Sequence, residues 1–188
     1  MFRELDVNFF VVIFLIVVPA YMANGFALLL GGGRPIDMGK NFIDGRRIFG
    51  EGKTLNGVIF GTIFGIFGYL IELMILSKLK IPISFYIQAK IYYFVLFGFF
   101  IAIGAVIGDL LGSFIKRRLG LPRGAPIPIL DQLDFISFSL LLAYLFNNFF
   151  QLVTIDIYII LVVLISTFIA HRVGCYLAYK IGKKKEPW

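Results

Sequence analysis

The chain has 188 residues, of which 60% are hydrophobic and 17% aromatic, and its formal net charge is +7. This apolar fraction lies far above that of soluble domains, so the composition indicates an integral membrane protein. A single cysteine, Cys175, excludes an intramolecular disulfide and a cysteine-based metal site. The positive charge lies in segments that flank apolar stretches. Membrane topology and anionic headgroups explain it, and no nucleic-acid partner is expected.

Five apolar stretches are long enough to cross ~30 Å of hydrocarbon at ~1.5 Å per residue. We predict transmembrane helices near residues 8–30, 55–76, 91–111, 133–150 and 157–178. The first stretch is too long, and too weakly basic in front, for a secretory signal, so we expect it to stay in the mature chain. The remaining residues leave no room for a soluble domain. The sequence therefore predicts one all-α membrane domain over residues 1–188.

The basic residues predict the orientation of these helices. They cluster between the first and second helices, between the third and fourth, and in the C-terminal tail. Only Arg3, Lys78, Lys80 and Lys90 fall on the opposite side. By the positive-inside rule the N-terminus lies outside and the C-terminus in the cytoplasm, so two loops are predicted to be cytoplasmic.

The first predicted helix contains Pro19 and the pair Asn24-Gly25. Pro and Gly are common in spanning helices, where neighbouring helices satisfy the freed backbone groups. We interpret this stretch as a kinked structural helix, in preference to one with a direct functional role.

Glycines recur at every fourth position in two of the predicted helices: Gly57, Gly61 and Gly65, then Gly104, Gly108 and Gly112. Such stripes allow helix backbones to approach closely in lipid. We expect the second and third helices to pack tightly on each other, and a homodimer formed through either stripe stays open as an alternative. The Gly112 surface is also expected to leave room for a ligand beside Asp109.

Acidic and basic residues alternate where the third helix ends and the fourth begins. Asp109 and Ser113 are four residues apart, Lys116-Arg117-Arg118 follows, and Asp131 and Asp134 are three residues apart. Both spacings put the paired side chains on one face of a helix. This arrangement suits a divalent cation that holds a polyphosphate, and hard oxygen ligands without a His or Cys cluster indicate Mg²⁺ rather than zinc.

Two segments carry a family resemblance. Gly108-Asp109-x-x-x-Ser113-x-x-Lys116-Arg117 followed by Asp131-x-x-Asp134 resembles the signature of the CTP:phosphatidate cytidylyltransferases. The sequence departs from the bacterial pattern, with Pro122-Arg123 in place of Lys-Asp and Pro126-Ile127-Pro128 in place of His-Gly-Gly. These departures and the short chain look more like the archaeal branch, the CDP-archaeol synthases. The first loop agrees, with Pro35-x-Asp37-x-Gly39-Lys40, Asp44-Gly45-Arg46-Arg47 and Gly50-x-Gly52-Lys53-Thr54-x-x-Gly57.

The resemblance implies transfer of CMP from CTP to the phosphate of an isoprenoid glycerol-phosphate lipid, 2,3-bis-O-(geranylgeranyl)-sn-glycerol 1-phosphate, with release of diphosphate. It implies a multi-pass protein of the cell membrane whose active site, in the two loops and the adjoining helix ends, faces cytoplasmic CTP. The implied catalytic residues are Asp109, Lys116 and Arg117, and the implied Mg²⁺ ligands are Asp109, Asp131 and Asp134. The implied nucleotide- and phosphate-binding residues are Lys40, Arg46, Arg47, Lys53, Asn56, Ser113 and Arg118.

The alternative from another class is a small membrane transporter or channel for an anionic solute. It explains the basic loops, but it explains poorly why acidic residues are paired at helical spacing on one side only. Transporters usually place polar groups near the bilayer midplane, often in internal repeats, and the sequence shows neither feature.

The apolar centres of the spans predict loose selectivity for the lipid. A pocket of that kind distinguishes one methylene by only ~1–3 kcal/mol. Discriminating an ether from an ester linkage would need a donor near the glycerol, and the sequence offers Asn56, Ser113 and Gln132, which we expect to be occupied elsewhere.

Overall fold

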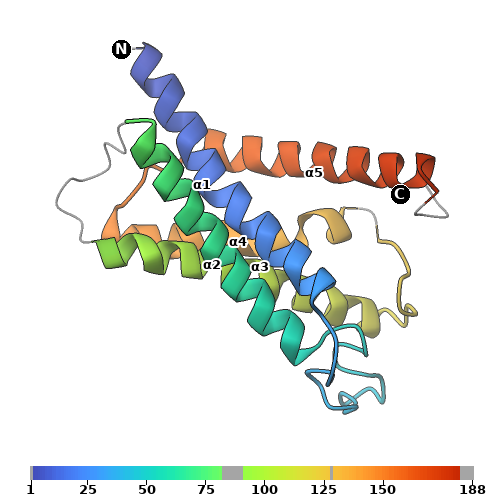
Figure 1. The fold of residues 1–188 in the computed structure, drawn as a ribbon. Helices are drawn as coiled ribbons and strands as arrows, with labels where there is room; N and C mark the ends of the chain where they lie inside the picture. Colours follow the sequence, from blue (N-terminus) through green and yellow to red (C-terminus); the bar gives the residue numbers. More distant parts are fainter. Residues whose placement is uncertain (1, 82–90, 128, 183–188) are drawn as a thin grey trace.

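The computed structural model describes residues 2–81, 91–127 and 129–182 (Figure 1). In this part of the chain all the regular elements are helices: α1 (Phe2–Leu29), α2 (Leu55–Lys78), α3 (Ile91–Arg118), α4 (Leu130–Phe150) and α5 (Ile157–Lys180). All five are long and apolar enough to cross a membrane. The prediction of an all-α membrane protein with five spans is confirmed.

Two helix ends differ from the prediction in ways that matter for the site. α3 continues to Arg118 instead of ending near residue 111, and α4 begins at Leu130 instead of near residue 133. Basic residues in the last turn of α3 interact favourably with the helix dipole, and so does Asp131 in the first turn of α4. These polar turns therefore extend the helices beyond their apolar stretches, and the predicted site residues Ser113, Lys116 and Asp131 lie on helix.

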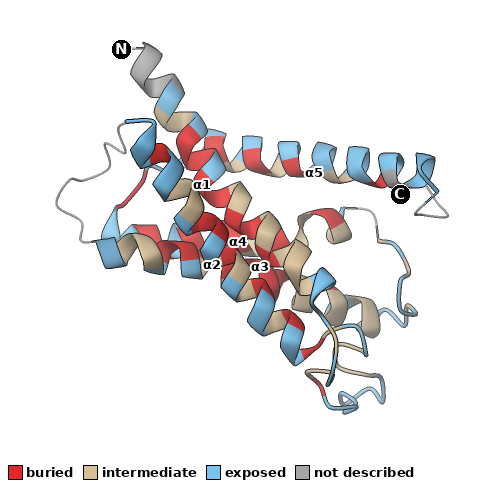
Figure 2. Ribbon diagram, in the orientation of Figure 1, coloured by how far each residue is buried: buried red, intermediate tan, exposed pale blue. Residues whose placement is uncertain are grey.

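The helices pack as two pairs that cross (Figure 1). α1 lies along α2, and α3 lies along α4, while α1 and α2 both also contact α3. The buried residues gather where α1, α3 and α4 meet, as Figure 2 shows. Leu15, Ile16, Ile101 and Ile136 are each fully buried there. α5 contacts α4 and α1 and is largely exposed along its length (Figure 2), as a helix facing lipid would be.

The glycine stripe of α2 faces both α1 and α3. A Cβ atom at Gly61 would lie 2.8 Å from the carbonyl oxygen of Ala23 in α1. At Gly65 it would lie 2.9 Å from the Cβ atom of Ala23 and 2.6 Å from that of Ala102 in α3. The predicted close packing of the second helix on the third is therefore present, and the same stripe also carries the contact with α1.

The glycine stripe of α3 faces α4, so this stripe does not carry the expected packing of the third helix on the second. A Cβ atom at Gly104 would lie 2.8 Å from the carbonyl oxygen of Phe138, and one at Gly108 would clash with the carbonyl group of Asp134. A Cβ atom at Gly112 would clash with the Asp134 carboxylate. The surface expected to leave room for a ligand beside Asp109 is thus occupied by Asp134.

Gly108→Ala should separate α3 from α4. The added methyl group meets backbone, which cannot rotate away, so we expect the free energy of unfolding to fall by ~1–3 kcal/mol. Thermal unfolding of the detergent-solubilised protein measures this. Gly174→Ala is the matched control, because a Cβ atom there meets nothing within 4 Å, and it should leave the unfolding midpoint unchanged or slightly higher. Equal midpoints for Gly108→Ala and the wild type would contradict the close contact.

Candidate active site

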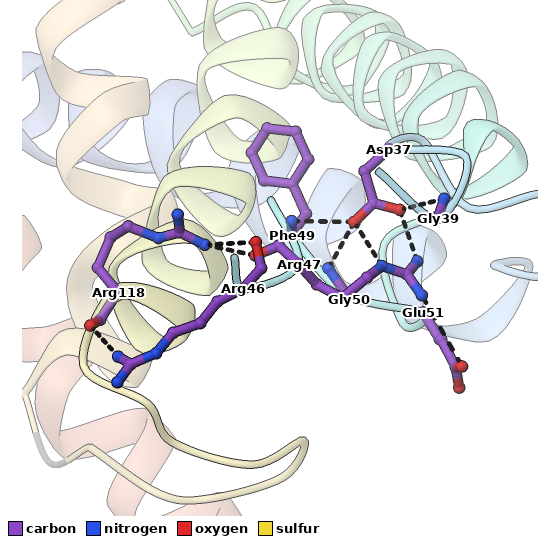
Figure 3. Close-up of polar contacts among 8 residues, drawn as sticks. All are labelled: Asp37, Gly39, Arg46, Arg47, Phe49, Gly50, Glu51 and Arg118. Carbon is purple, nitrogen blue, oxygen red and sulfur yellow. Dashed lines mark hydrogen bonds and ion pairs between the residues drawn. The ribbon is translucent and has the colours of Figure 1, made fainter. Parts of the chain in front are cut away.

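The loop between α1 and α2 folds around the carboxylate of Asp37. An Arg47 Nη2 atom donates to it at 2.6 Å, and the backbone N–H groups of Gly39, Phe49 and Gly50 donate at 3.1, 3.1 and 2.9 Å (Figure 3). The Asp37 side chain has no exposed surface. A single carboxylate therefore holds together chain segments on both sides of this loop.

The opposite charges of Asp37 and Arg47 stabilise this part of the loop at neutral pH. Burial by itself would raise the pKa of Asp37, but the hydrogen bonds from Arg47, Gly50, Phe49 and Gly39 outweigh burial and hold the pKa well below its usual range. The hydrogen bond to Asp37 in turn raises the pKa of Arg47. Both groups are consequently charged under physiological conditions, and the Arg47 guanidinium is committed to the structure of the loop.

A reciprocal pair of arginines joins this loop to the end of α3. Arg46 donates through Nη1 to the carbonyl oxygen of Arg118, in the last turn of α3 (Figure 3). Arg118 donates to the carbonyl oxygens of Arg46 and Arg47, and it pairs with the Asp44 carboxylate at 2.7 Å. Each guanidinium thus satisfies carbonyl groups of the other segment, and the loop is fixed against the end of the helix.

Aromatic rings strengthen this junction. The Arg118 guanidinium lies 4.8 Å from the ring centroids of both Phe42, in the loop, and Phe114, in α3. A cation at this distance is attracted to the ring face by ~0.5–1 kcal/mol or more. Arg118 donates through both Nη atoms and Arg46 through Nη1, and these contacts favour an anchoring role for both side chains. Their predicted phosphate binding stays a prediction.

An acidic cavity of about 410 Å³ lies where the α2 N-terminus meets α1, α3 and α4. Three carboxylates line it: Asp109 from α3, and Asp131 and Asp134 from α4. The close contact of α3 with α4 brings these acids to one place, and Asp109 and Asp131 both act electrostatically on Asp134.

Two lysines balance part of this negative charge. The Nζ atom of Lys53 lies 2.6 Å from both carboxylate oxygens of Asp109, and Lys116 forms an ion pair with Asp131. All four side chains are about a quarter exposed or less, so their charges are only partly screened by solvent. The cavity therefore holds acids and cations in direct contact, with Asp134 seated against α3.

A larger basic cavity of about 720 Å³ adjoins the acidic one, and the two share Lys53, Ser113 and Lys116 in their walls. Its cationic lining residues are Arg46, Arg47, Lys53, Lys116, Arg117 and Arg123. Arg117 donates to the carbonyl oxygen of Pro122 at 3.1 Å, while its buried Nε atom has no hydrogen-bond partner in the described structure. This cavity can neutralise several negative charges at once.

Most of the predicted site residues meet in these two cavities. The predicted residues that line one or both are Arg46, Arg47, Lys53, Asp109, Ser113, Lys116, Arg117, Asp131 and Asp134. Lys40, Asn56 and Arg118 line neither cavity. Lys40 is exposed on the loop, and Asn56 lies beside Gly33, whose Cβ position is 3.3 Å from the Asn56 Nδ2 atom.

Sequence reasoning missed Asn24 and Thr54, which both line the acidic cavity. Thr54 caps α2, and its hydroxyl accepts from the backbone N–H groups of Gly57 and Gly32 at 3.1 and 3.0 Å. A Thr immediately before an apolar helix is a usual N-cap signal, so this role could have been found. Asn24 precedes Gly25 in an apolar stretch of α1, and by sequence this pair is interpreted as part of a kink.

Fold and site together define a class: a helical intramembrane protein with an acidic and a basic cavity side by side, suited to phosphorylated substrates. The family model described as "CarS-like: CDP-archaeol synthase" matches residues 5–188. The chain therefore belongs to the CDP-archaeol synthase family, a family of enzymes.

Individual relatives agree with this assignment. The chain is 42% identical over 177 residues to the CDP-archaeol synthase of Methanococcoides burtonii, covering 92% of this chain and 100% of the relative. It is 41% identical to that of Methanocaldococcus jannaschii, covering 92% and 93%. A solved structure described as an intramembrane enzyme for archaeal membrane lipids biosynthesis is 30% identical with a TM-score of 0.71, covering 86% of this chain and 90% of that one. The transporter alternative receives no support from these relatives.

Asp37→Asn should loosen the loop between α1 and α2 at neutral pH, because the amide cannot accept all of the hydrogen bonds made to the carboxylate. In the wild type the pKa of Asp37 is lower in the folded state. The stabilisation is therefore present above the unfolded pKa of about 3.9, and it is lost as pH falls from there through the folded value. Hydrogen exchange of residues 34–54 measures both effects.

Glu51→Gln is the control for that experiment. Its side chain is 72% exposed and its carboxylate lies 3.9 Å from Arg47, so the substitution should leave loop protection unchanged. Equal protection in the wild type and Asp37→Asn at pH 7 would show that Asp37 does not organise the loop.

Proposed function

We propose that this chain transfers CMP from CTP to the phosphate of 2,3-bis-O-(geranylgeranyl)-sn-glycerol 1-phosphate and releases diphosphate. Membership of the CDP-archaeol synthase family supports the reaction. The structural observation that carries it is the pair of adjoining cavities, one acidic and one basic, with Lys53, Ser113 and Lys116 in their common wall. Two phosphate groups can meet at that wall, one from each substrate.

CTP would occupy the basic cavity. Its triphosphate needs several cationic partners, and Arg117 and Arg123 line this cavity together with the shared lysines. α2 begins at Leu55, shortly after Gly52 and Lys53, which line both cavities, and its N-terminus adds favourable potential for an anion on the side of the acidic cavity. The positive-inside rule puts both cavities on the cytoplasmic side of the cell membrane, where CTP is available.

The acids suit Mg²⁺, the divalent cation that this chemistry implies. Among the described residues no three His, Cys, Asp or Glu side chains lie close enough to form a ready-made metal site. Mg²⁺ bound with a nucleotide needs only one or two carboxylates, because water and phosphate oxygens complete its six ligands. Asp109, Asp131 and Asp134 supply hard oxygen donors in one cavity and so fit this requirement. The cation, when bound, neutralises charge on the phosphates.

The reaction itself needs little from the protein beyond position and charge. The second pKa of a phosphate monoester is about 6, so near neutral pH the lipid phosphate is already a dianion and needs no general base. One of its oxygens forms a bond to the α-phosphorus of CTP, and the bond from that phosphorus to the bridging oxygen of the diphosphate breaks. Lys53 and Lys116 can hold the two phosphates together, and Arg117 can neutralise the departing diphosphate.

Isotope transfer tests this function directly. With CTP labelled at the α-phosphorus the label should appear in the lipid fraction, and with CTP labelled at the γ-phosphorus it should appear in diphosphate. The appearance of label in either product should require the lipid phosphate monoester. A folded protein that moves an anionic solute across vesicles without labelling lipid would overturn the proposal in favour of transport.

Asp134→Asn should lower turnover by ~10²–10³-fold, because an amide neither carries the charge nor replaces a carboxylate as a Mg²⁺ ligand. Its stability should change little, since the described contacts of the Asp134 carboxylate are with its own helix and the Gly112 surface. Asp156→Asn is the matched control. Asp156 caps α5, and Asn caps equally well, so turnover and stability should both be retained. Near-normal turnover in a folded Asp134→Asn protein would remove Asp134 from the site.

A further inference from the structure

Asn24 is a polar residue in the apolar helix α1, and it lines the acidic cavity. It is half-buried, and no described residue forms a hydrogen bond with its side-chain amide. An amide within a transmembrane helix is costly unless a partner satisfies it. A ligand in the cavity is a natural source of that partner.

Contacts between helices fix the level at which Asn24 lies. A Cβ atom at Gly61 of α2 would touch the Ala23 carbonyl oxygen on one side and Val106 of α3, at 3.2 Å, on the other. Asn24 is one residue past Ala23 and Asp109 is three residues past Val106, so the amide lies about two residues, ~3 Å along the helix axis, from the level of Asp109, on the side away from the first loop.

The walls of the cavity change character between these two levels. Near the loop they carry Lys53, Ser113 and Lys116, whereas on the side of Asn24 they include Val106, which lies with Ala23 across Gly61. A lipid whose phosphate lies between the two lysines would extend its chains towards the apolar end. Its glycerol, which directly follows the phosphate, would then lie at the level of Asn24.

The chemistry of the amide matches that position. The two ether oxygens of the glycerol can only accept hydrogen bonds, and the Asn side chain carries an NH₂ group with two donors. Ser113, one of the donors considered from the sequence, lies at the polar end of the cavity, while Asn56 and Gln132 do not line it. Asn24 is thus a donor at the membrane side of the site that the sequence interpretation overlooked.

We propose that Asn24 is a specificity-determining residue that donates a hydrogen bond to a glycerol ether oxygen of the lipid substrate. This rests on the proposed function. Under this proposal only apolar packing selects the tail length, whereas the amide recognises the glycerol oxygens. The predicted loose selectivity therefore applies to the tails and not to the glycerol.

The test compares two acceptors that differ in their glycerol oxygens. Asn24→Leu should lower kcat/KM for the geranylgeranyl diether glycerol phosphate by ~10–100-fold, as expected when a hydrogen-bonding contact to a substrate is removed. The KM for CTP should stay unchanged. With a long-chain alkyl phosphate, which has no glycerol oxygen, wild type and Asn24→Leu should have equal kcat/KM.

Two further variants make the result interpretable. Asn8→Leu is the same substitution in the same helix but away from the lining of either cavity, and it should match the wild type with both acceptors. Asn24→Ser keeps a shorter donor and should lose less than Asn24→Leu with the diether; it also serves if Asn24→Leu does not fold.

Equal losses with both acceptors would overturn the inference, because the amide would then act on the phosphate or on the fold. Unchanged kcat/KM with both acceptors in Asn24→Leu and Asn24→Ser would overturn it as well. If the wild type itself transfers no CMP to either phosphate, the proposed function fails first and the inference with it. If the wild type transfers CMP normally and the Asn24 variants have the same kcat/KM, the inference is wrong but the proposed function stands.

Discussion

The close contact between α3 and α4 is the constraint on which the site depends. Glycines at positions 104 and 108 let the two backbones meet with no side chain between them, and Gly112 leaves room for the Asp134 carboxylate. The contact sets the register of the two helices, so Asp134 of α4 reaches α3 beside Asp109. Any side chain at Gly108 would push the fourth helix away and carry Asp131 and Asp134 with it.

The first loop depends on the same helix for its position. Phe114 and Arg118 of α3 hold the loop from one side, and within the loop Asp37 fixes the segment that carries Arg47 and Gly50. The basic residues of the chain consequently have two roles, one structural and one in the cavities. Arg46, Arg47 and Arg118 join segments of the protein through carbonyl and carboxylate groups. Lys53 and Lys116 pair with acids inside the cavities, where we propose that phosphates bind. Composition alone cannot separate the two kinds, because both raise the net charge equally.

The sequence was sufficient for the parts of the structure that follow from local pattern. Apolar length predicted five helices, and the spacing of Asp131 and Asp134 placed both on one helix face. The sequence did not predict the features that depend on which helices contact each other. The α3 stripe faces α4 because of the three-dimensional path of the chain, and Gly112 is covered by Asp134 for the same reason. Asn24 was read as part of a kink because only the fold reveals that a cavity lies beside it.

Binding of a manganese–CTP complex tests most directly whether the seating of Asp134 against Gly112 of α3 builds the site. Electron paramagnetic resonance of Mn²⁺ in the presence of CTP reports the bound ion. Gly112→Ala chiefly displaces the Asp134 carboxylate, which can rotate, and the Asp134 Cβ atom, at 3.2 Å from the new methyl group, needs to shift only slightly. The account predicts that wild type binds the complex and that Gly112→Ala, while keeping its thermal stability, binds it ~10–100-fold more weakly. Equal binding of manganese–CTP by the wild type and by Gly112→Ala would contradict it.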